Sequence, residues 1–283
     1  MSTRFSKYTA WKMIQSTLIH IFLMSVTLTC LFPLLWMFRC SFMTNDTVFV
    51  DQGLIPHHLD FSNFASAWTK GNFGVYFINS VIYTVSVVFG IVLISSLAAY
   101  AFSRLKFPGK NILFYLFVAA MMIPLPGSFV ALFVLMTKLH LINTRLGYIL
   151  CMINVGLSMS ILLLKTFFDK MPHDLEDAAR IDGCSKIGIW LHMALPFARP
   201  AIAVIVIFNS LNVWNEYILA FLLLGDSNLM PLQRGLVVFQ GANSTDYPVL
   251  MAGLTMAAVP IIMVYLFMQK YIVKGLSSGE VIG

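Results

Sequence analysis

Charged side chains are scarce in this sequence, at 11% of 283 residues, while 59% of the residues are hydrophobic. Soluble globular domains average about 25% charged residues, so this composition excludes that class. Six apolar runs are instead long enough to cross a bilayer as helices. The predicted spans are Thr17–Phe38, Val75–Phe102, Ile112–Met136, Leu146–Leu164, Ala201–Leu224 and Val249–Met268. Because the runs are continuously apolar and not alternating, they exclude a membrane β-barrel and predict an all-α polytopic membrane protein with six transmembrane helices.

Motifs for catalysis and metal binding are also missing. The four cysteines have no paired spacing, so neither a disulfide framework nor a metal site is indicated. The spans carry no His-Glu-x-x-His, Ser/Lys or paired-aspartate constellation, and the chain has no Gly-x-x-x-x-Gly-Lys-Ser/Thr phosphate loop. We therefore expect no enzyme activity, no catalytic residue, no metal ligand and no cofactor bound by this chain. The adjacent His57 and His58 lack further ligands nearby and are interpreted as surface-loop residues.

Basic residues are distributed unevenly between the predicted loops. With the N-terminus inside, the inner segments hold 13 of the 18 Lys and Arg residues and the outer segments hold five. The excess of basic residues on one side predicts that both termini are cytoplasmic. This asymmetry also accounts for the formal net charge of +6, so the basic balance indicates topology and no nucleic-acid partner.

The first apolar run follows basic residues, as the core of a signal peptide does. It is too long for such a core and lacks a small-residue cleavage site, so we expect a permanent span. The predicted organisation is a cytoplasmic tail over residues 1–16, a membrane domain over 17–270 and a cytoplasmic tail over 271–283. Outside the membrane, residues 59–68 predict a short amphipathic helix on the bilayer face.

Residues 168–199 form a polar segment between two predicted spans, and local rules divide it into two short helices. Asp174 is a good N-cap residue, and Asp177 lies three residues later, where its carboxylate can reach back to the cap amide. Gly183 can adopt the left-handed conformation that ends a helix. Ser185 then caps a second helix, which Pro196 is expected to stop.

This segment also resembles a family motif. Asp177-Ala178-Ala179, Gly183 and Leu195-Pro196 have the spacing of the EAA loop of ATP-binding cassette (ABC) importer permeases. That pattern is Glu-Ala-Ala, three residues, Gly, nine residues, Ile, one residue and Leu-Pro. Asp177 stands in place of the Glu and Met193 in place of the Ile, and the neighbouring Glu176 is a second candidate for the role of the missing Glu. The two alanines leave one helix face nearly bare, so that a partner can approach closely.

Two further strings resemble the carbohydrate (maltose-type) branch of this family, and the smaller of its two permease subunits in particular. They are Ala-Tyr-Ala-Phe-Ser-Arg over residues 99–104 and Trp-Asn-Glu-Tyr over residues 214–217. The resemblance implies the type I ABC importer permease fold and a multi-pass protein of the bacterial inner membrane. The implied contacts with an ATPase come from Glu176, Asp177, Ala178, Ala179, Asp182, Gly183, Met193, Leu195 and Pro196.

The resemblance also implies the partners and the mechanism. They are a second homologous permease, two ATPase subunits that bind ATP and Mg²⁺, an extracytoplasmic solute-binding protein, membrane lipid, and a sugar or oligosaccharide cargo. In the maltose-type relatives the outer loop before the last span reaches into the binding protein, and residues 225–248 match that loop by position. The implied mechanism is alternating access driven by the separate ATPases.

The fifth predicted span carries a polar stripe of Asn209, Asn212, Asn215 and Glu216. On a continuous helix these residues share an arc of roughly 120°. A charged side chain at the bilayer centre costs on the order of 2.5–3.5 kcal/mol on insertion scales, so this face should avoid lipid. The stripe either lines the cargo path or joins neighbouring helices through hydrogen bonds.

Other interpretations remain open at this point. The same machinery could carry a glycerol phosphate or another polar solute. An ion-coupled secondary transporter would use an intramembrane charge such as Glu216, although the chain shows no convincing repeat. In the third predicted span, Pro124, Pro126 and Gly127 indicate a kink that either flexes or is static.

Overall fold

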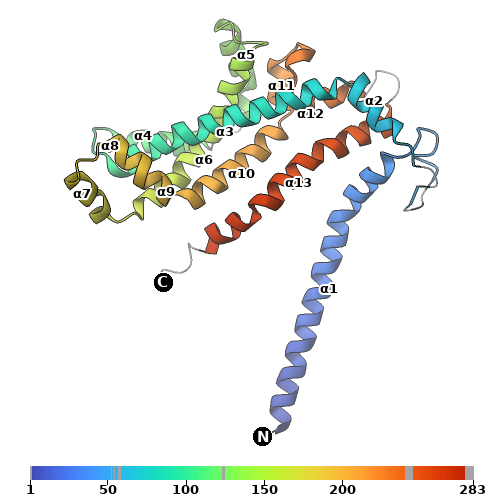
Figure 1. Ribbon diagram of the computed structural model, residues 1–283, viewed down its shortest axis with the longest axis horizontal. Helices are drawn as coiled ribbons and strands as arrows, with labels where there is room; N and C mark the ends of the chain where they lie inside the picture. Colours follow the sequence, from blue (N-terminus) through green and yellow to red (C-terminus); the bar gives the residue numbers. More distant parts are fainter. Residues whose placement is uncertain are drawn as a thin grey trace. The chain divides into compact units, whose positions relative to one another are not determined.

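The computed structural model describes residues 2–51, 53, 55–56, 59–122, 125–239 and 245–277 of the chain. The elements in these ranges are helices (Figure 1). They are α1 Ser2–Cys40, α2 Ser62–Lys70, α3 Phe73–Arg104, α4 Lys110–Ala120, α5 Leu125–Lys138, α6 Arg145–Asp169, α7 His173–Ile181, α8 Lys186–Ile189, the π-helical η1 Trp190–Ala194, α9 Leu195–Phe197, α10 Arg199–Trp214, α11 Ile218–Leu223, the 3₁₀ turn η2 Ser227–Leu229, α12 Leu232–Gly235, the 3₁₀ turn η3 Leu236–Phe239, and α13 Tyr247–Ser277.

Four of these helices are long and apolar enough to cross a membrane. They are Trp11–Cys40, Phe73–Arg104, Arg145–Asp169 and Tyr247–Phe267. The segments Lys186–Phe197 and Arg199–Trp214 meet at an angle of 77°, and as one broken span they would make a fifth. The described residues therefore form an all-helical polytopic membrane fold with four or five candidate spans.

Two predicted spans are not continuous helices. Over residues 112–136, α4 ends at Ala120 and α5 begins at Leu125, because the intervening sequence leads into prolines that cannot continue the hydrogen-bond ladder. Pro126 lies in the first turn of α5, where a missing N–H is tolerated. Over residues 201–224, α10 ends at Trp214 and α11 begins at Ile218. Pro124 lies outside the described residues, so the nature of the expected kink stays a prediction.

The chain divides into two compact units, of which the first contains residues 1–71 and 238–256. Here α1 is continuous through the predicted tail boundary at residue 16. The short helix expected over residues 59–68 is observed as α2. The buried amide of Asn63 in α2 donates hydrogen bonds to the carbonyl oxygens of Ser41 at 3.0 Å and Met43 at 2.8 Å. These bonds attach α2 to the turn that follows α1.

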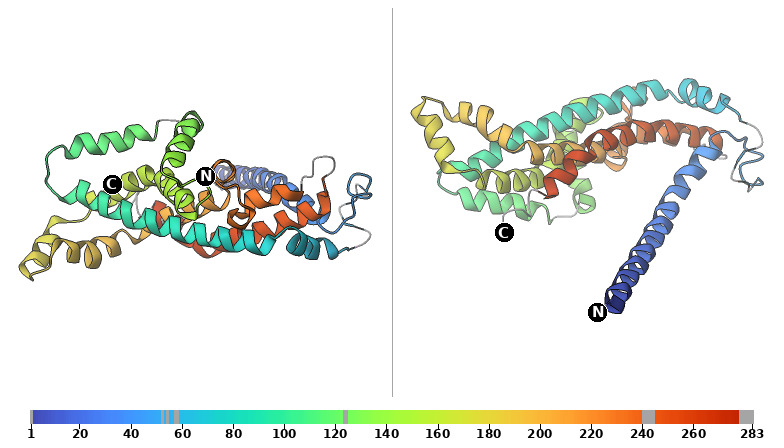
Figure 2. Two further views of the ribbon diagram at one scale, coloured as in Figure 1. Left: turned by 90° about the horizontal axis from the view of Figure 1, so that it is seen from above. Right: turned by 60° about the horizontal axis from the view of Figure 1, so that its bottom comes forward.

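The second unit contains residues 72–237 and 257–283 and holds the main core. Its long helices α3, α6 and α10 pack side by side (Figure 1). The buried rings of Tyr83 on α3 and Tyr148 on α6 meet edge to face with centroids 4.7 Å apart. The short helices α7 and α8 lie at one end of this unit, in yellow and gold in Figure 2. The packed core therefore presents the polar segment at its end.

Candidate functional site

The polar segment 168–199 begins with a helix whose start differs from the prediction. The N-cap of α7 is Pro172, and no side chain caps the helix. Asp174 is therefore not the N-cap residue: it lies inside the first turn, because the helix already begins after Pro172, whose ψ of 137° is not helical. Asp174 and Glu176 in that first turn are still favoured by the positive end of the helix dipole.

The turn between α7 and α8 follows the sequence prediction. Gly183 has φ +81°, in the left-handed region, and follows the C-cap residue Asp182. The N–H of Cys184 donates to the carbonyl of Ala179 at 2.9 Å, which closes the end of α7. Ser185 is the N-cap of α8, and its hydroxyl accepts the N–H of Gly188 at 3.1 Å. The predicted helix-turn-helix is confirmed here.

The second helix does not stop at Pro196, as the sequence predicted. The chain forms the π turn η1 over Trp190–Ala194 and remains helical to Phe197. In this turn the N–H of Leu195 bonds to the carbonyl of Trp190, five residues earlier. The wider π turn shifts the hydrogen-bond pairing from four residues to five just before Pro196. Pro196 has no N–H to donate and would otherwise interrupt a regular α-helix at this point. The sharp change of direction comes after Phe197, before α10 starts at Arg199.

The two acidic candidates of α7 have different environments. Glu176 is buried at 2% exposure, and its carboxylate pairs with Arg104 at 3.2 Å and with Arg180 at 3.4 Å. The Asp177 side chain is 65% exposed and pairs with Arg180 at 3.2 Å. Asp177 therefore faces outward, whereas Glu176 faces the chain's own core.

The two alanines also separate. Ala178 is exposed, but Ala179 is only 7% exposed and belongs to the core of the second unit. The expectation that both alanines face a partner is corrected, because consecutive residues of a helix point 100° apart and the inner face of α7 is occupied. Met193 and Leu195 likewise pack partly buried against the core, Pro196 is half-buried and Asp182 is exposed.

Exposed apolar residues on the segment were missed by the sequence analysis. Ile181 at the end of α7 is 86% exposed, and Ile187 in α8 is 69% exposed. These two aliphatic side chains are therefore not covered by the chain's own core. Their position within a polar helix pair was the available sequence signal.

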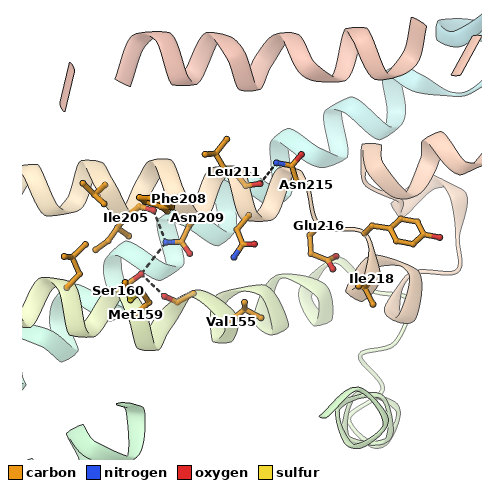
Figure 3. A pocket seen from close by; sticks show the side chains of 15 residues that line it. Val155, Met159, Ser160, Ile205, Phe208, Asn209, Leu211, Asn215, Glu216 and Ile218 are labelled. Atoms are coloured by element: carbon orange, nitrogen blue, oxygen red, sulfur yellow. Dashed lines mark hydrogen bonds between the residues drawn. The ribbon is translucent and has the colours of Figure 1, made fainter. Parts of the chain in front are cut away.

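A cavity of about 950 Å³ lies beside α6, α10 and the stretch that follows α10 (Figure 3). All four residues of the predicted stripe line it, together with apolar side chains such as Met159 and Phe208. The structure therefore brings the stripe to one wall of a hollow, but its members have different roles.

Asn209 joins two of the helices that line this cavity. Its buried amide donates to the carbonyl of Ile205 at 2.8 Å and to the hydroxyl of Ser160 on α6 at 3.4 Å (Figure 3). This geometry corresponds to the interpretation of the stripe as a link between helices.

Glu216 is not on α10, so the helical arc calculated for the stripe does not extend to it. Its carboxylate accepts the N–H groups of Leu219 at 2.7 Å and Ala220 at 3.0 Å. It also accepts the hydroxyl of Tyr148 on α6 at 3.3 Å. Three hydrogen bonds from the chain itself satisfy the carboxylate, which holds the break between α10 and α11 in place.

Asn212 and Asn215 are the exposed amides of the wall. Asn215 donates to the carbonyl of Leu211 at 2.9 Å, while Asn212 has no hydrogen bond within the described part of the chain. Next to them, Tyr217 lines the cavity and stacks on Phe221 with ring centroids 5.9 Å apart. An aromatic ring beside exposed amides can contact the apolar face and the hydroxyls of a polar solute.

Across the described ranges, no three His, Cys, Asp or Glu side chains are grouped so that they could hold a metal ion. The His57 and His58 pair lies outside the described residues.

Comparison with known proteins places these features in context. Residues 86–278 match the family described as "Binding-protein-dependent transport system inner membrane component". The chain is 36% identical over 270 residues to the probable ABC transporter permease protein YurM of Bacillus subtilis (strain 168), covering 95% of this chain and 90% of that protein. It is 33% identical over 262 residues to the diacetylchitobiose uptake system permease protein NgcG of Streptomyces coelicolor, covering 92% and 87% of the two chains.

A solved structure is also similar. The crystal structure of a bacterial ABC transporter involved in the import of the acidic polysaccharide alginate matches with a TM-score of 0.80 and 26% sequence identity. The match covers 91% of this chain and 96% of that one, so it extends over nearly the whole fold.

Proposed function

We propose a cargo and a coupling mechanism for this chain, which belongs to the family of binding-protein-dependent transport system inner membrane components. It is a multi-pass permease subunit of the inner membrane, is not itself an enzyme, and belongs to a family of subunits without bound cofactors. Binding-protein-dependent ABC transport implies ATPase, binding-protein and permease partners. The proposed cargo is a sugar or oligosaccharide, delivered by an extracytoplasmic binding protein.

The observation that carries this proposal is the family match over residues 86–278, which includes both the polar segment and the cavity. Relatives named for diacetylchitobiose uptake and alginate import support a carbohydrate cargo. No Lys or Arg is found among the described residues that line the cavity. This lining favours a neutral sugar over a glycerol phosphate. The secondary-transport alternative relied on Glu216, whose carboxylate is occupied by hydrogen bonds to its own chain.

The proposed assembly has two homologous permeases and two ATPases, with the segment 168–199 seated on one ATPase. Asp177, Ala178, Ile181 and Ile187 would face the ATPase, because they are among the exposed residues of α7 and α8. ATP can drive alternating access only as far as it binds the two conformations with different affinity. The ATPase must therefore hold the segment differently in its open and closed states.

The proposed topology has six spans, with α4 and α5 forming one broken span and α10 and α11 forming another. Both termini, residues 1–16 and 271–283, would be cytoplasmic on either side of a membrane domain over 17–270. Reporter fusions at Lys106 and His173 should then report the cytoplasm, and fusions at Asp60 and His140 the exterior. An external signal at His173 would contradict the proposal, since a cytoplasmic ATPase could not reach it.

The test of function is transport by the complete complex. The chain, its partner permease, the ATPases and the binding protein are reconstituted in vesicles, and uptake of labelled chito-oligosaccharide, maltose and glycerol 3-phosphate is compared with and without ATP. ATP-dependent uptake of a sugar that requires the binding protein supports the proposal. Uptake of glycerol 3-phosphate alone, or uptake independent of ATP, would reject it.

A further inference from the structure

We propose that Arg104 and Glu176 form a rigid joint that passes the displacement of α7 to α3 and α6 during transport. The proposal rests on the proposed seating of segment 168–199 on an ATPase. It assigns positioning roles to two residues that face away from the proposed ATPase surface, one of them outside the segment.

Arg104 is the last residue of α3 and holds three other parts of the chain. Its side chain is 2% exposed, and its Nε lies 3.2 Å from Oε1 of Glu176 on α7. Its Nη2 donates to the carbonyl oxygens of Phe168, near the end of α6, and of Met171, in the connection to α7. Its Nη1 lies 3.0 Å from Nδ1 of His173 at the start of α7. One guanidinium therefore contacts the end of α6, the connection and α7 together.

Glu176 depends on this contact. Its side chain is 2% exposed, and Oε1 has no hydrogen-bond partner elsewhere in the described residues. The same is true of Nε of Arg104, so each atom has the other as its charge partner. The other carboxylate oxygen is held by Arg180, 3.4 Å away, one turn along α7. A buried carboxylate between two guanidinium groups resists displacement, because moving it away leaves buried charge without compensation.

The ends of α3 and α6 are themselves joined. The hydroxyl of Ser103 donates to Oδ1 of Asp169 at 2.6 Å, and Lys165 bonds to Oδ2 of the same residue at 2.6 Å. Force applied to Arg104 therefore reaches both helices, which pack along their lengths.

The covalent path out of the segment is less direct. From α8 the chain passes through the π turn Trp190–Ala194 and then bends by 77° before α10. A π turn and a sharp bend have fewer regular hydrogen bonds than a continuous helix and can absorb a displacement. The ion-pair joint is thus the stiffer route from α7 into the membrane helices.

The experiment measures coupling in the complete complex in vesicles, as sugar molecules transported per ATP hydrolysed, together with ATPase recovery on affinity purification. Glu176→Gln should lower the transport-to-ATP ratio at least tenfold, while ATPase recovery stays within twofold of wild type. Asp174→Asn is the matched control, because it removes one negative charge from an exposed position of the same turn. The control should keep the wild-type ratio.

A double variant, Arg104→Met with Glu176→Met, separates positioning from stability. Replacing both charges with apolar groups leaves no uncompensated charge, although the carbonyl oxygens of Phe168 and Met171 lose their donor, so the yield of folded chain should exceed that of Arg104→Met alone. If the pair positions α7, the ratio stays low in this variant even though the yield is higher. If either Glu176→Gln or the double variant transports as many sugar molecules per ATP hydrolysed as the wild type, the proposed joint is rejected. Absence of ATP-dependent uptake by the wild-type complex would instead reject the proposed function.

Discussion

The amide oxygen of Asn209 occupies the space that a side chain at Gly156 would need. A Cβ built on Gly156 would lie 2.3 Å from Oδ1 of Asn209. The Asn209 amide cannot turn away freely, because its nitrogen is bonded to Ile205 and Ser160. Gly156 thus allows a close approach of α6 and α10, as small residues do in membrane bundles.

Gly156→Ala should therefore destabilise the packing of α6 on α10. We expect a loss of about 1–3 kcal/mol, the usual cost of overpacking a filled site. The measurement is the thermal unfolding midpoint of the purified complex in detergent. Gly127→Ala is the control, because a Cβ there would meet nothing within 4 Å. Equal midpoints for the two variants would contradict the tight contact.

Replacing Asn212 with Leu should reduce transport without reducing stability. Asn212 lines the cavity with an exposed amide that makes no hydrogen bond within the described chain, so its removal leaves no partner unsatisfied. We expect at least a fivefold fall in sugar uptake, with basal ATP hydrolysis and the unfolding midpoint close to wild type. Asn209→Leu, which breaks the link to Ser160, should instead lower the midpoint. Unchanged uptake in Asn212→Leu would remove this residue from the cargo path.

Glu216→Leu should act on structure. The change leaves the N–H groups of Leu219 and Ala220 and the hydroxyl of Tyr148 without their acceptor. Each unsatisfied buried group costs about 1–3 kcal/mol, so the yield of folded complex should fall strongly. Tyr148→Phe loses only the 3.3 Å bond and should cost about 1 kcal/mol. The yield and the thermal unfolding midpoint of the two variants are measured together. If Glu216→Leu is as stable as Tyr148→Phe, the carboxylate does not stabilise the break between α10 and α11.

These residues also show how far the sequence could predict the site. Gly183 and Ser185 were predicted correctly because their roles depend on local backbone rules. Glu216 was assigned to the wrong element, because a helical arc assumes a continuous helix and α10 ends at Trp214. The arc could identify a polar wall of the cavity. It could not show that Asn209 bonds to a neighbouring helix while Asn212 stays unbonded within the described chain, because that difference depends on which side chain of α6 lies opposite each residue.

The same limit applies to the polar segment and to the spans. Asp177 matched the family spacing, yet which of Glu176 and Asp177 turns inward depends on Arg104, 72 positions before Glu176 in the chain. The π turn before Pro196 was also beyond local rules, because proline predicts a helix end and not a change of register. Apolar length identified the long helices well, but it could not predict that α4 and α5 are separate.

The outer face of α7 and α8 provides the test of coupling. Ala178 is exposed between Asp177 and the buried Ala179, so Ala178→Trp adds bulk on the side proposed for the ATPase and leaves the core intact. Ala179→Trp would instead disrupt this chain's own packing and cannot test docking. We expect Ala178→Trp to reduce ATPase recovery on affinity purification at least tenfold, with the permease still folded and inserted.

Substitutions at Gly183 test the same surface by changing only the backbone conformation of the turn between α7 and α8. A Cβ at Gly183 meets nothing within 4 Å, so a substitution there acts through its φ of +81°. Gly183→Val should cost about 1–2 kcal/mol, because a β-branched residue is strained in the left-handed region. Gly183→Asn should be milder, since asparagine tolerates that region. If the turn presents the two helices to the ATPase, uptake should fall in the order Gly, Asn, Val, and ATPase recovery should fall in parallel. Normal recovery and uptake for both Gly183→Val and Ala178→Trp would show that this segment is not where the ATPase couples to the permease.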